Sequence, residues 1–216
     1  MDETLAQIHR CGVIPVVTIQ NAGDAPALGR ALLDGGLPCA EITFRAAAAE
    51  AAIRGLTQAF PKMLVGAGTV LTVEQAQRAV AAGARFIVTP GFDAQVVDWC
   101  LAQGIPITPG VATPTEINMA LAKGLHVVKF FPAEAMGGLK TLKAIAAPYG
   151  AVRFIPTGGI NPDNLASYLT LPQVHACGGS WLVSKQLIAA GDFRTIRLKT
   201  QEAMALMALA RGGGVS

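Results

Sequence analysis

One lysine of this chain lies within an apolar segment. Lys129 is preceded by two valines and followed by two phenylalanines, whereas the other lysines follow a proline or lie among helix-forming residues. A low-dielectric surrounding disfavours an ammonium ion and favours the free amine, which can condense with a ketone or aldehyde. Lys129 is therefore a candidate nucleophile. The alternative is a lysine without chemistry, whose aliphatic stem carries the charge to the rim of the fold.

A carboxylate, a hydroxyl and a guanidinium alternate in the segment Glu41-Ile-Thr-Phe-Arg45. In a strand, Glu41, Thr43 and Arg45 would share one face, while Ile42 and Phe44 would point toward covering helices. The three polar side chains are thus expected to point into one interior or toward its mouth.

Lys129 can face the same interior as Glu41. Alternation along residues 126–131 places Lys129 on one face with Phe131. An inward carboxylate is costly to bury without a partner, so we expect Glu41 either to hydrogen-bond within the site or to act as a general acid/base. The alternative is a structural ion pair between Glu41 and Arg45.

Two glycine-rich segments are typical of an anion site. Residues 156–162 (Pro-Thr-Gly-Gly-Ile-Asn-Pro) follow the seventh predicted strand, and residues 177–181 (Cys-Gly-Gly-Ser-Trp) follow the eighth. Glycines there expose backbone N–H groups that can bind phosphate beside a helix N-terminus. One glycine pair is usually a turn, but two at strand ends favour a site. Thr69 could bind a carboxylate at the same mouth, where Pro90 could only shape the pocket.

These residues need a scaffold, and the chain predicts alternating strands and helices. Short apolar runs recur roughly every 20 to 27 residues, the length of one strand, one loop and one helix. About eight such units close a barrel, so we predict an α/β fold, a (β/α)8 TIM barrel. The alternative is an open doubly wound sheet, but no Gly-rich nucleotide loop follows the first run. The predicted strands are residues 13–17, 39–44, 63–67, 86–89, 105–109, 127–131, 152–156 and 174–177.

Helix signals occupy the segments between these strands. Thr113-Pro-Thr-Glu116 and Thr72-Val-Glu-Gln75 are predicted capping boxes, and Asn161-Pro162 is expected to open another helix. The alanine-rich residues 46–52 are also predicted to be helical. Several helical patterns end on a glycine, as expected at a helix C-terminus: Gly36, Gly83, Gly104 and Gly124.

Composition limits the architecture and the partners. The 216 residues are 52% hydrophobic and 14% charged, and no shift in composition divides them. We therefore predict one barrel domain over residues 1–216, with a frayed tail at 212–216. The net charge of +3 comes without a long basic run, so a small acidic substrate fits better than nucleic acid.

The metal-ligating residue types are scattered. Four cysteines form no CxxC pair and are expected to be structural thiols, and three separated histidines predict no metal site. No signal peptide begins the chain, and no apolar run reaches membrane-spanning length. We therefore expect a cytoplasmic protein without a membrane partner.

Seven motifs occur in order along almost the whole chain: residues 41–45, 66–70, 88–91, 109–116, 128–133, 156–160 and 178–181. Together they resemble the 2-keto-3-deoxy-6-phosphogluconate (KDPG) aldolase / 4-hydroxy-2-oxoglutarate (KHG) aldolase family. The resemblance implies a class I aldolase on a (β/α)8 barrel, homotrimeric, independent of metals and cofactors, with a small phosphorylated 2-keto acid as substrate. Some members also cleave KHG.

The resemblance also implies a role for each motif residue. Lys129 would form the Schiff base, and Glu41 would be the general acid/base. The substrate contacts would be Arg45 and Thr69 for the carboxylate, Thr157 for a hydroxyl, Gly158, Gly159, Gly179 and Ser180 for the phosphate, and Phe131 and Pro90 for packing.

One position departs from the family pattern, and several functions remain open. Ala46 stands where similar proteins often have a hydroxyl residue, which puts a loop or capping hydrogen bond in doubt. The resemblance also implies the gluconate substrate rather than its galactonate epimer, because similar galactonate-phosphate aldolases tend to have other residues in place of Thr157 and Ser180. Other candidates are an aldolase that prefers unphosphorylated KHG, a noncatalytic barrel that binds a phosphorylated acid, and an isomerase or decarboxylase that uses Glu41 without an imine.

Overall fold

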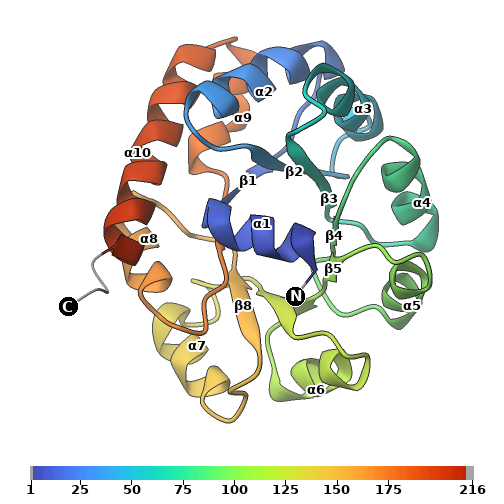
Figure 1. Cartoon of the computed structure of the whole chain (residues 1–216), viewed down its shortest axis with the longest axis vertical. Coiled ribbons are helices and arrows are strands. Elements are labelled where there is room, and N and C mark those ends of the chain that lie inside the picture. The colour runs from blue at the N-terminus through green and yellow to red at the C-terminus, as the bar shows by residue number, and fades with distance from the viewer. Residues whose placement is uncertain (1, 213–216) are drawn as a thin grey trace.

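Parallel strands form a ring at the centre of the molecule, and helices surround it (Figure 1). The computed structural model describes residues 2–212. Most of the predicted apolar runs coincide with strands to within a few residues. The strands are β1 Val13–Val17, β2 Cys39–Thr43, β3 Leu64–Gly68, β4 Ile87–Val88, β5 Ile107–Thr108, β6 Gly110–Val111, β7 Val127–Phe130, β8 Arg153–Pro156 and β9 Cys177–Gly179.

The ring is an eight-stranded parallel barrel assembled from two sheets. One sheet has the order β5-β4-β3-β2-β1-β9 and the other the order β6-β7-β8. β5 and β6 are two halves of one barrel strand, separated by Pro109. Parallel bridges from Phe154 to Val174 and from Thr157 to Gly178 join β8 to the segment that contains β9. The predicted (β/α)8 barrel is confirmed.

Several helices begin at the predicted caps. Thr113 and Glu116 form a reciprocal capping box, and Asn161 and Asn164 form another. The predicted box at Thr72 is only half formed: Thr72 accepts a hydrogen bond from the N–H of Gln75, but the Gln75 side chain accepts from the N–H of Leu71. The α-helices are α1 Glu3–Cys11, α2 Ala25–Asp34, α3 Ala49–Ala59, α4 Val73–Ala81, α5 Ala94–Ala102, α6 Pro114–Ala122, α7 Gly138–Ala146, α8 Pro162–Leu169, α9 Lys185–Ala189 and α10 Phe193–Gly212, and two 3-10 turns are η1 Ala22–Asp24 and η2 Trp181–Val183.

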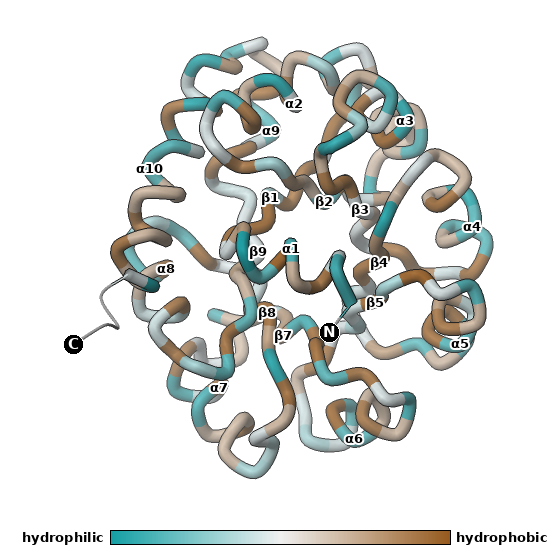
Figure 2. The backbone as a smooth tube through the Cα atoms, in the orientation of Figure 1, coloured by the Kyte–Doolittle hydropathy of each residue, from teal (hydrophilic) through white to brown (hydrophobic). Residues whose placement is uncertain are grey.

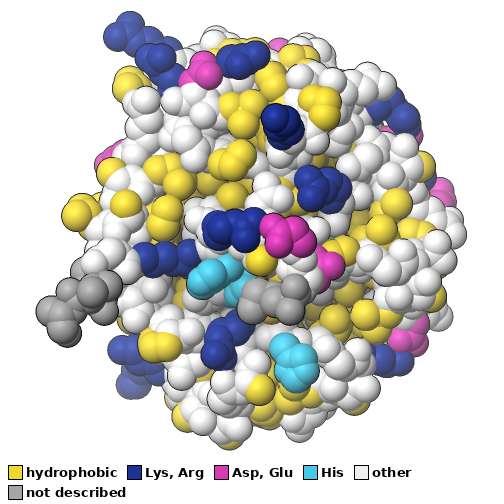
Figure 3. Space-filling model, in the orientation of Figure 1, with side chains coloured by type: hydrophobic (Ala, Val, Ile, Leu, Met, Phe, Trp, Pro, Cys, Tyr) yellow, Lys and Arg dark blue, Asp and Glu magenta, His cyan; other side chains and the backbone are white. Residues whose placement is uncertain are grey.

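Helix α1 covers one end of the barrel, as Figures 1 and 3 show. His175 Nε2 contacts the carbonyl of Leu5 in α1 at 2.8 Å, and His175 precedes β9, so the covered end is the one where the strands begin. Burial lowers the pKa of His175 to about 4, which keeps this imidazole neutral near pH 7. The opposite end, where the strands finish, is left to the loops that carry the predicted site residues.

Apolar residues line the inner strands and the inward helix faces, and they form one core (Figure 2). All four cysteines are free thiols buried in the protein, as expected. Within residues 2–212, no helix is long and apolar enough to cross a bilayer.

Three predicted boundaries are wrong. The eighth strand is Cys177–Gly179, not residues 174–177, because Gly178 and Gly179 pair with β1 rather than forming a loop. The predicted helix at 46–52 begins only at Ala49, since residues 46–48 form a turn without a side-chain cap. The fifth strand continues past Pro109 into β6, and proline interrupts the ladder because it has no N–H to donate.

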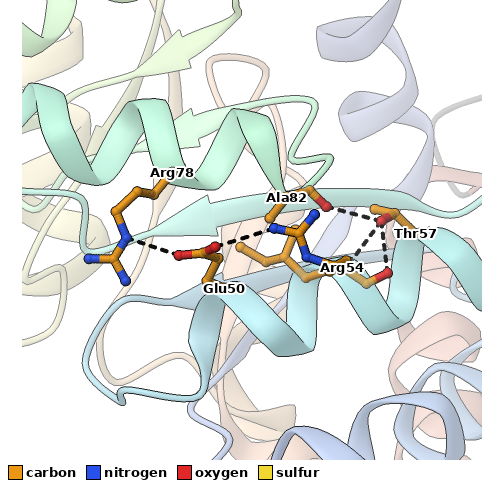
Figure 4. Close-up of polar contacts among 6 residues, drawn as sticks. Glu50, Arg54, Thr57, Arg78 and Ala82 are labelled. Atoms are coloured by element: carbon orange, nitrogen blue, oxygen red, sulfur yellow. Dashed lines mark hydrogen bonds and ion pairs between the residues drawn. The ribbon is translucent and has the colours of Figure 1, made fainter.

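Ion pairs on the outer surface connect neighbouring helices. Glu50 of α3 contacts Arg54 of its own helix at 3.3 Å and Arg78 of α4 at 2.9 Å (Figure 4). The hydroxyl of Thr57 donates to the carbonyl of Ala82 just beyond α4. Exposed pairs of this kind stabilise weakly, so the buried core dominates the stability of the barrel.

The predicted frayed tail, residues 212–216, falls almost wholly outside the described residues. Gly212 is the last residue of α10, and residues 213–216 are not described.

Close packing inside the barrel generates a stability prediction. A Cβ atom added at Gly66 would lie 2.3 Å from Cζ of Phe86. We expect Gly66→Ala to lower the free energy of unfolding by about 1–3 kcal/mol through overpacking, measured by urea denaturation. Gly150→Ala is the matched control, because its added Cβ would meet nothing within 4 Å. Equal unfolding midpoints for the two variants would contradict the prediction.

Candidate active site

A lysine and a glutamate meet inside the barrel. Lys129 lies on β7 and Glu41 on β2, and Lys129 Nζ is 3.7 Å from Glu41 Oε1. Each side chain is only 3% exposed. Two charged groups buried this deeply are expected to be paired, because each is costly to remove from water alone. The expectation that Lys129 and Glu41 share one interior is confirmed.

The contact between the two groups leaves hydrogen-bonding capacity unused. A separation of 3.7 Å is longer than a hydrogen bond, and Glu41 Oε1 has no hydrogen-bond partner among the described residues. Lys129 Nζ also lies 5.1 Å from the centre of the Phe131 ring. A buried carboxylate oxygen without a donor can accept a proton or a hydrogen bond from a bound molecule.

Glycine creates the space that Glu41 occupies. A Cβ atom at Gly68, on the neighbouring strand β3, would lie 1.9 Å from Glu41 Oε1. Gly68 pairs with Thr43 in the register of β2 and β3. The absence of a side chain at position 68 therefore lets the carboxylate fill this part of the barrel interior.

Thr43 is a structural residue at this end of the barrel. Its hydroxyl donates to the carbonyl of Val17 at 2.8 Å and contacts the hydroxyl of Thr18 at 2.9 Å. Because Thr43 uses its proton on Val17, the hydroxyl of Thr18 is the donor between the two threonines. Thr43 thus fixes Thr18, which lines the cavity described below.

Arg45 lies just beyond β2, and its side chain is exposed. The salt bridge of Glu41 is with Lys129, so the structural Glu41–Arg45 pair considered from the sequence is not the arrangement adopted. Arg45 remains at the mouth of the barrel, where it can meet an anion.

Thr69 has an uncommon backbone conformation. It follows β3 with φ of 54°, in the left-handed region that β-branched residues rarely adopt. Such a conformation costs on the order of 1–3 kcal/mol and persists where the surroundings enforce it.

Pro90 follows β4 and lies against Gly110. A Cβ atom added at Gly110 would be 2.1 Å from the carbonyl oxygen of Pro90. Thr69 and Pro90 are both partly buried at strand ends, as predicted.

A cavity of about 390 Å³ opens at this end of the barrel. Arg45 and Lys185 are the charged residues of its lining, so its charge is positive. Seven residues predicted from the sequence line it: Arg45, Phe131, Thr157, Gly158, Gly159, Gly179 and Ser180. The lining does not include Lys129, Glu41, Thr69 or Pro90. Phe131 lines the cavity, and the centre of its ring lies 5.1 Å from Lys129 Nζ.

Sequence reasoning missed several lining residues, including Thr18, Ser184 and Lys185. Thr18 directly follows β1, so the rule that selected the other strand ends would have found it. Ser184 and Lys185 come after η2, a short turn that follows β9 and that no pattern predicted.

The described residues contain no group of three or more His, Cys, Asp or Glu side chains that could hold a metal ion. The available chemistry is that of a buried amine, a buried carboxylate and a nearby cationic cavity. This set suits covalent catalysis on a carbonyl compound that carries negative charge.

Comparisons with known proteins agree with this chemistry. Residues 5–198 match the model of the KDPG and KHG aldolase family. The 2-dehydro-3-deoxy-phosphogluconate aldolase of Treponema pallidum is 54% identical over 93% of this chain and 95% of its own length. The KHG/KDPG aldolase of Escherichia coli is 41% identical over 89% of this chain and 90% of its own length.

A solved structure is similar as well. The KDPG aldolase of Legionella pneumophila, with pyruvate captured as a covalent carbinolamine, gives a TM-score of 0.88 at 41% identity. The match covers 94% of this chain and 97% of that one. With its barrel, its buried lysine and its matching sequence, the chain belongs to the KDPG and KHG aldolase family.

Proposed function

We propose that this protein is a class I aldolase that cleaves KDPG to pyruvate and glyceraldehyde 3-phosphate, and that KHG is a second substrate. The observation that carries the proposal is the 3.7 Å approach of two buried groups, Lys129 Nζ and Glu41 Oε1, beside a cationic cavity. The names of the relatives support the substrates, since some are KDPG aldolases and others KHG/KDPG aldolases.

The chemistry begins with the amine. Lys129 attacks the C2 carbonyl, and loss of water from the carbinolamine gives an iminium that withdraws electrons from C3. Glu41 removes the proton of the C4 hydroxyl, the C3–C4 bond breaks, and its electron pair forms an enamine. Glyceraldehyde 3-phosphate leaves first. Protonation of the enamine at C3 and hydrolysis of the imine release pyruvate and restore Lys129.

The substrate is held by groups at both sides of the lysine. Arg45 and Thr69 bind the carboxylate, and Thr157 binds a hydroxyl. Phe131 and Pro90 pack against the carbon chain. Gly158, Gly159, Gly179 and Ser180 bind the phosphate. With Arg45 assigned to the carboxylate, Lys185 is the remaining cation of the cavity, and we assign it to the phosphate.

The alternatives considered from the sequence fit less well. A noncatalytic barrel gives no reason for a buried amine to lie beside a carboxylate oxygen without a donor. Relatives that are 54% and 45% identical carry the gluconate name, which favours that epimer over galactonate.

Imine formation tests the central claim. Borohydride reduction in the presence of pyruvate is expected to add a stable adduct to the Lys129 peptide, detected by mass spectrometry. Lys129→Ala should lose both the adduct and the cleavage of KDPG while circular dichroism shows a folded barrel. Lys140→Ala, which changes an exposed lysine of α7, is the control and should keep both. Folded wild-type protein without the adduct would refute the aldolase.

Lys185 generates a prediction about substrate preference. Lys185→Gln should raise the KM for KDPG by roughly three- to tenfold, since one charge-assisted contact is lost, and leave the KM for unphosphorylated KHG unchanged. Lys62→Gln is the control, because Lys62 is exposed and precedes β3, at the other end of the barrel. An equal rise for both substrates would remove Lys185 from the phosphate site.

We further propose a homotrimer in the cytoplasm, as the family resemblance implies. Sedimentation equilibrium is expected to give three times the chain mass of 22.3 kDa. A mass that stays at one chain across the concentration range would overturn the trimer.

A further inference from the structure

We propose that Glu134 and Tyr168 are positioning residues that hold residues 157–160, here called the phosphate loop, in the shape that binds the substrate phosphate. The proposal rests on the aldolase function proposed above. It concerns two residues to which the catalytic scheme gives no role. Glu134 follows the motif that contains Lys129, and Tyr168 lies in α8.

Three carbonyl groups of the phosphate loop accept hydrogen bonds, those of Thr157, Gly158 and Gly159. The carbonyl of Thr157 accepts from the N–H of Ala133 at 2.8 Å, and that of Gly158 accepts from the N–H of Glu134 at 3.0 Å. The carbonyl of Gly159 accepts from the side-chain amides of Asn164, at 3.1 Å, and Asn161, at 3.3 Å. These hydrogen bonds to its backbone carbonyl groups therefore hold the loop in place.

Two donors of the same loop are free. Within the described part of the chain, the N–H groups of Gly159 and Ile160 donate to no protein acceptor. The N–H of Gly158 faces the carbonyl of Gly178 in the parallel bridge between Thr157 and Gly178. Gly158 and Gly159 have φ of 99° and 85°, a conformation that only glycine adopts readily. All three residues line the cavity. Successive free N–H groups of this kind form a concave anion site.

The side chain of Glu134 supports this loop directly. A Cβ atom at Gly159 would lie 2.5 Å from Cγ and 2.6 Å from Cβ of Glu134. The methylene groups of Glu134 thus lie against the backbone of Gly159. Glu134 does not line the cavity, so its negative charge is kept out of the space that the phosphate would enter.

Tyr168 holds Glu134 in this position. Its side chain is 1% exposed, and its hydroxyl donates a hydrogen bond to Glu134 Oε1. Burial, together with the bond to Glu134, raises the pKa of Tyr168 well above its usual value, so the hydroxyl stays protonated and remains a donor. Without this donor, the carboxylate would be free to rotate toward the phosphate and repel it.

The test compares Tyr168→Phe with Tyr149→Phe. Tyr149 is the other tyrosine of the chain, and its hydroxyl contacts Pro114 and Asn118, away from the loop. Tyr168→Phe is expected to raise the KM for KDPG and the Kd for inorganic phosphate by roughly 5- to 20-fold. Its kcat and KM for KHG, and its borohydride adduct with pyruvate, should stay at the wild-type level. Tyr149→Phe should change none of these.

Variants of Glu134 separate positioning from general stability. Glu134→Gln keeps an oxygen that can accept from Tyr168, so its phosphate affinity should stay within about twofold of wild type. Glu134→Ala removes both the support and the acceptor, and should weaken phosphate binding as Tyr168→Phe does. Thermal melting of each variant confirms that the protein is folded at the assay temperature.

Two outcomes would overturn the proposal. One is an unchanged affinity for phosphate in both Tyr168→Phe and Glu134→Ala. The other is an equal loss for KDPG and KHG, which would indicate a general structural defect. The phosphate titration decides the role of the loop even if the wild-type protein forms no adduct with pyruvate, so failure of the aldolase function and failure of this proposal are distinguishable.

Discussion

The rest of the structure depends on one constraint, the burial of an amine and a carboxylate in the barrel interior. Each ion costs several kcal/mol to remove from water, and an interior with only one of them would be strongly destabilised. Lys129 and Glu41 lie on β7 and β2, strands of different sheets, so only a closed barrel brings them together. Burial of the surrounding apolar core provides the favourable free energy that offsets the cost of removing these two groups from water.

Glycine solves the packing problem that this pair creates. Gly68 leaves room for the carboxylate of Glu41, and Gly178 leaves room for Thr157, whose Oγ1 would lie 2.4 Å from an added Cβ. In both cases a small residue on one strand accepts a polar side chain from its neighbour. The positions of Glu41 and Thr157 therefore require glycine at positions 68 and 178, although these glycines take no part in the chemistry.

Much of the barrel could be predicted because its signals are local. β1 begins and ends at the residues that its apolar run indicates, and the box at Thr113 and Glu116 forms as expected. β9 was misplaced because Gly178 and Gly179 have low strand propensity, and only pairing with β1 makes them a strand. Lys185 was missed because its place in the cavity comes from η2, a turn that sequence periodicity does not reveal. Alternation sufficed for Lys129 and Glu41, because a strand fixes the direction of each side chain.

The interruption at Pro109 divides the barrel into two arcs. One arc is the six-stranded sheet that carries Glu41, and the other is the three-stranded sheet that carries Lys129. The arcs meet at the split strand and at the isolated bridges near Val174 and Gly178, where few ladder hydrogen bonds cross. The distance between the amine and the carboxylate is therefore set by how the two arcs meet at these seams, and not by the ladders inside either arc.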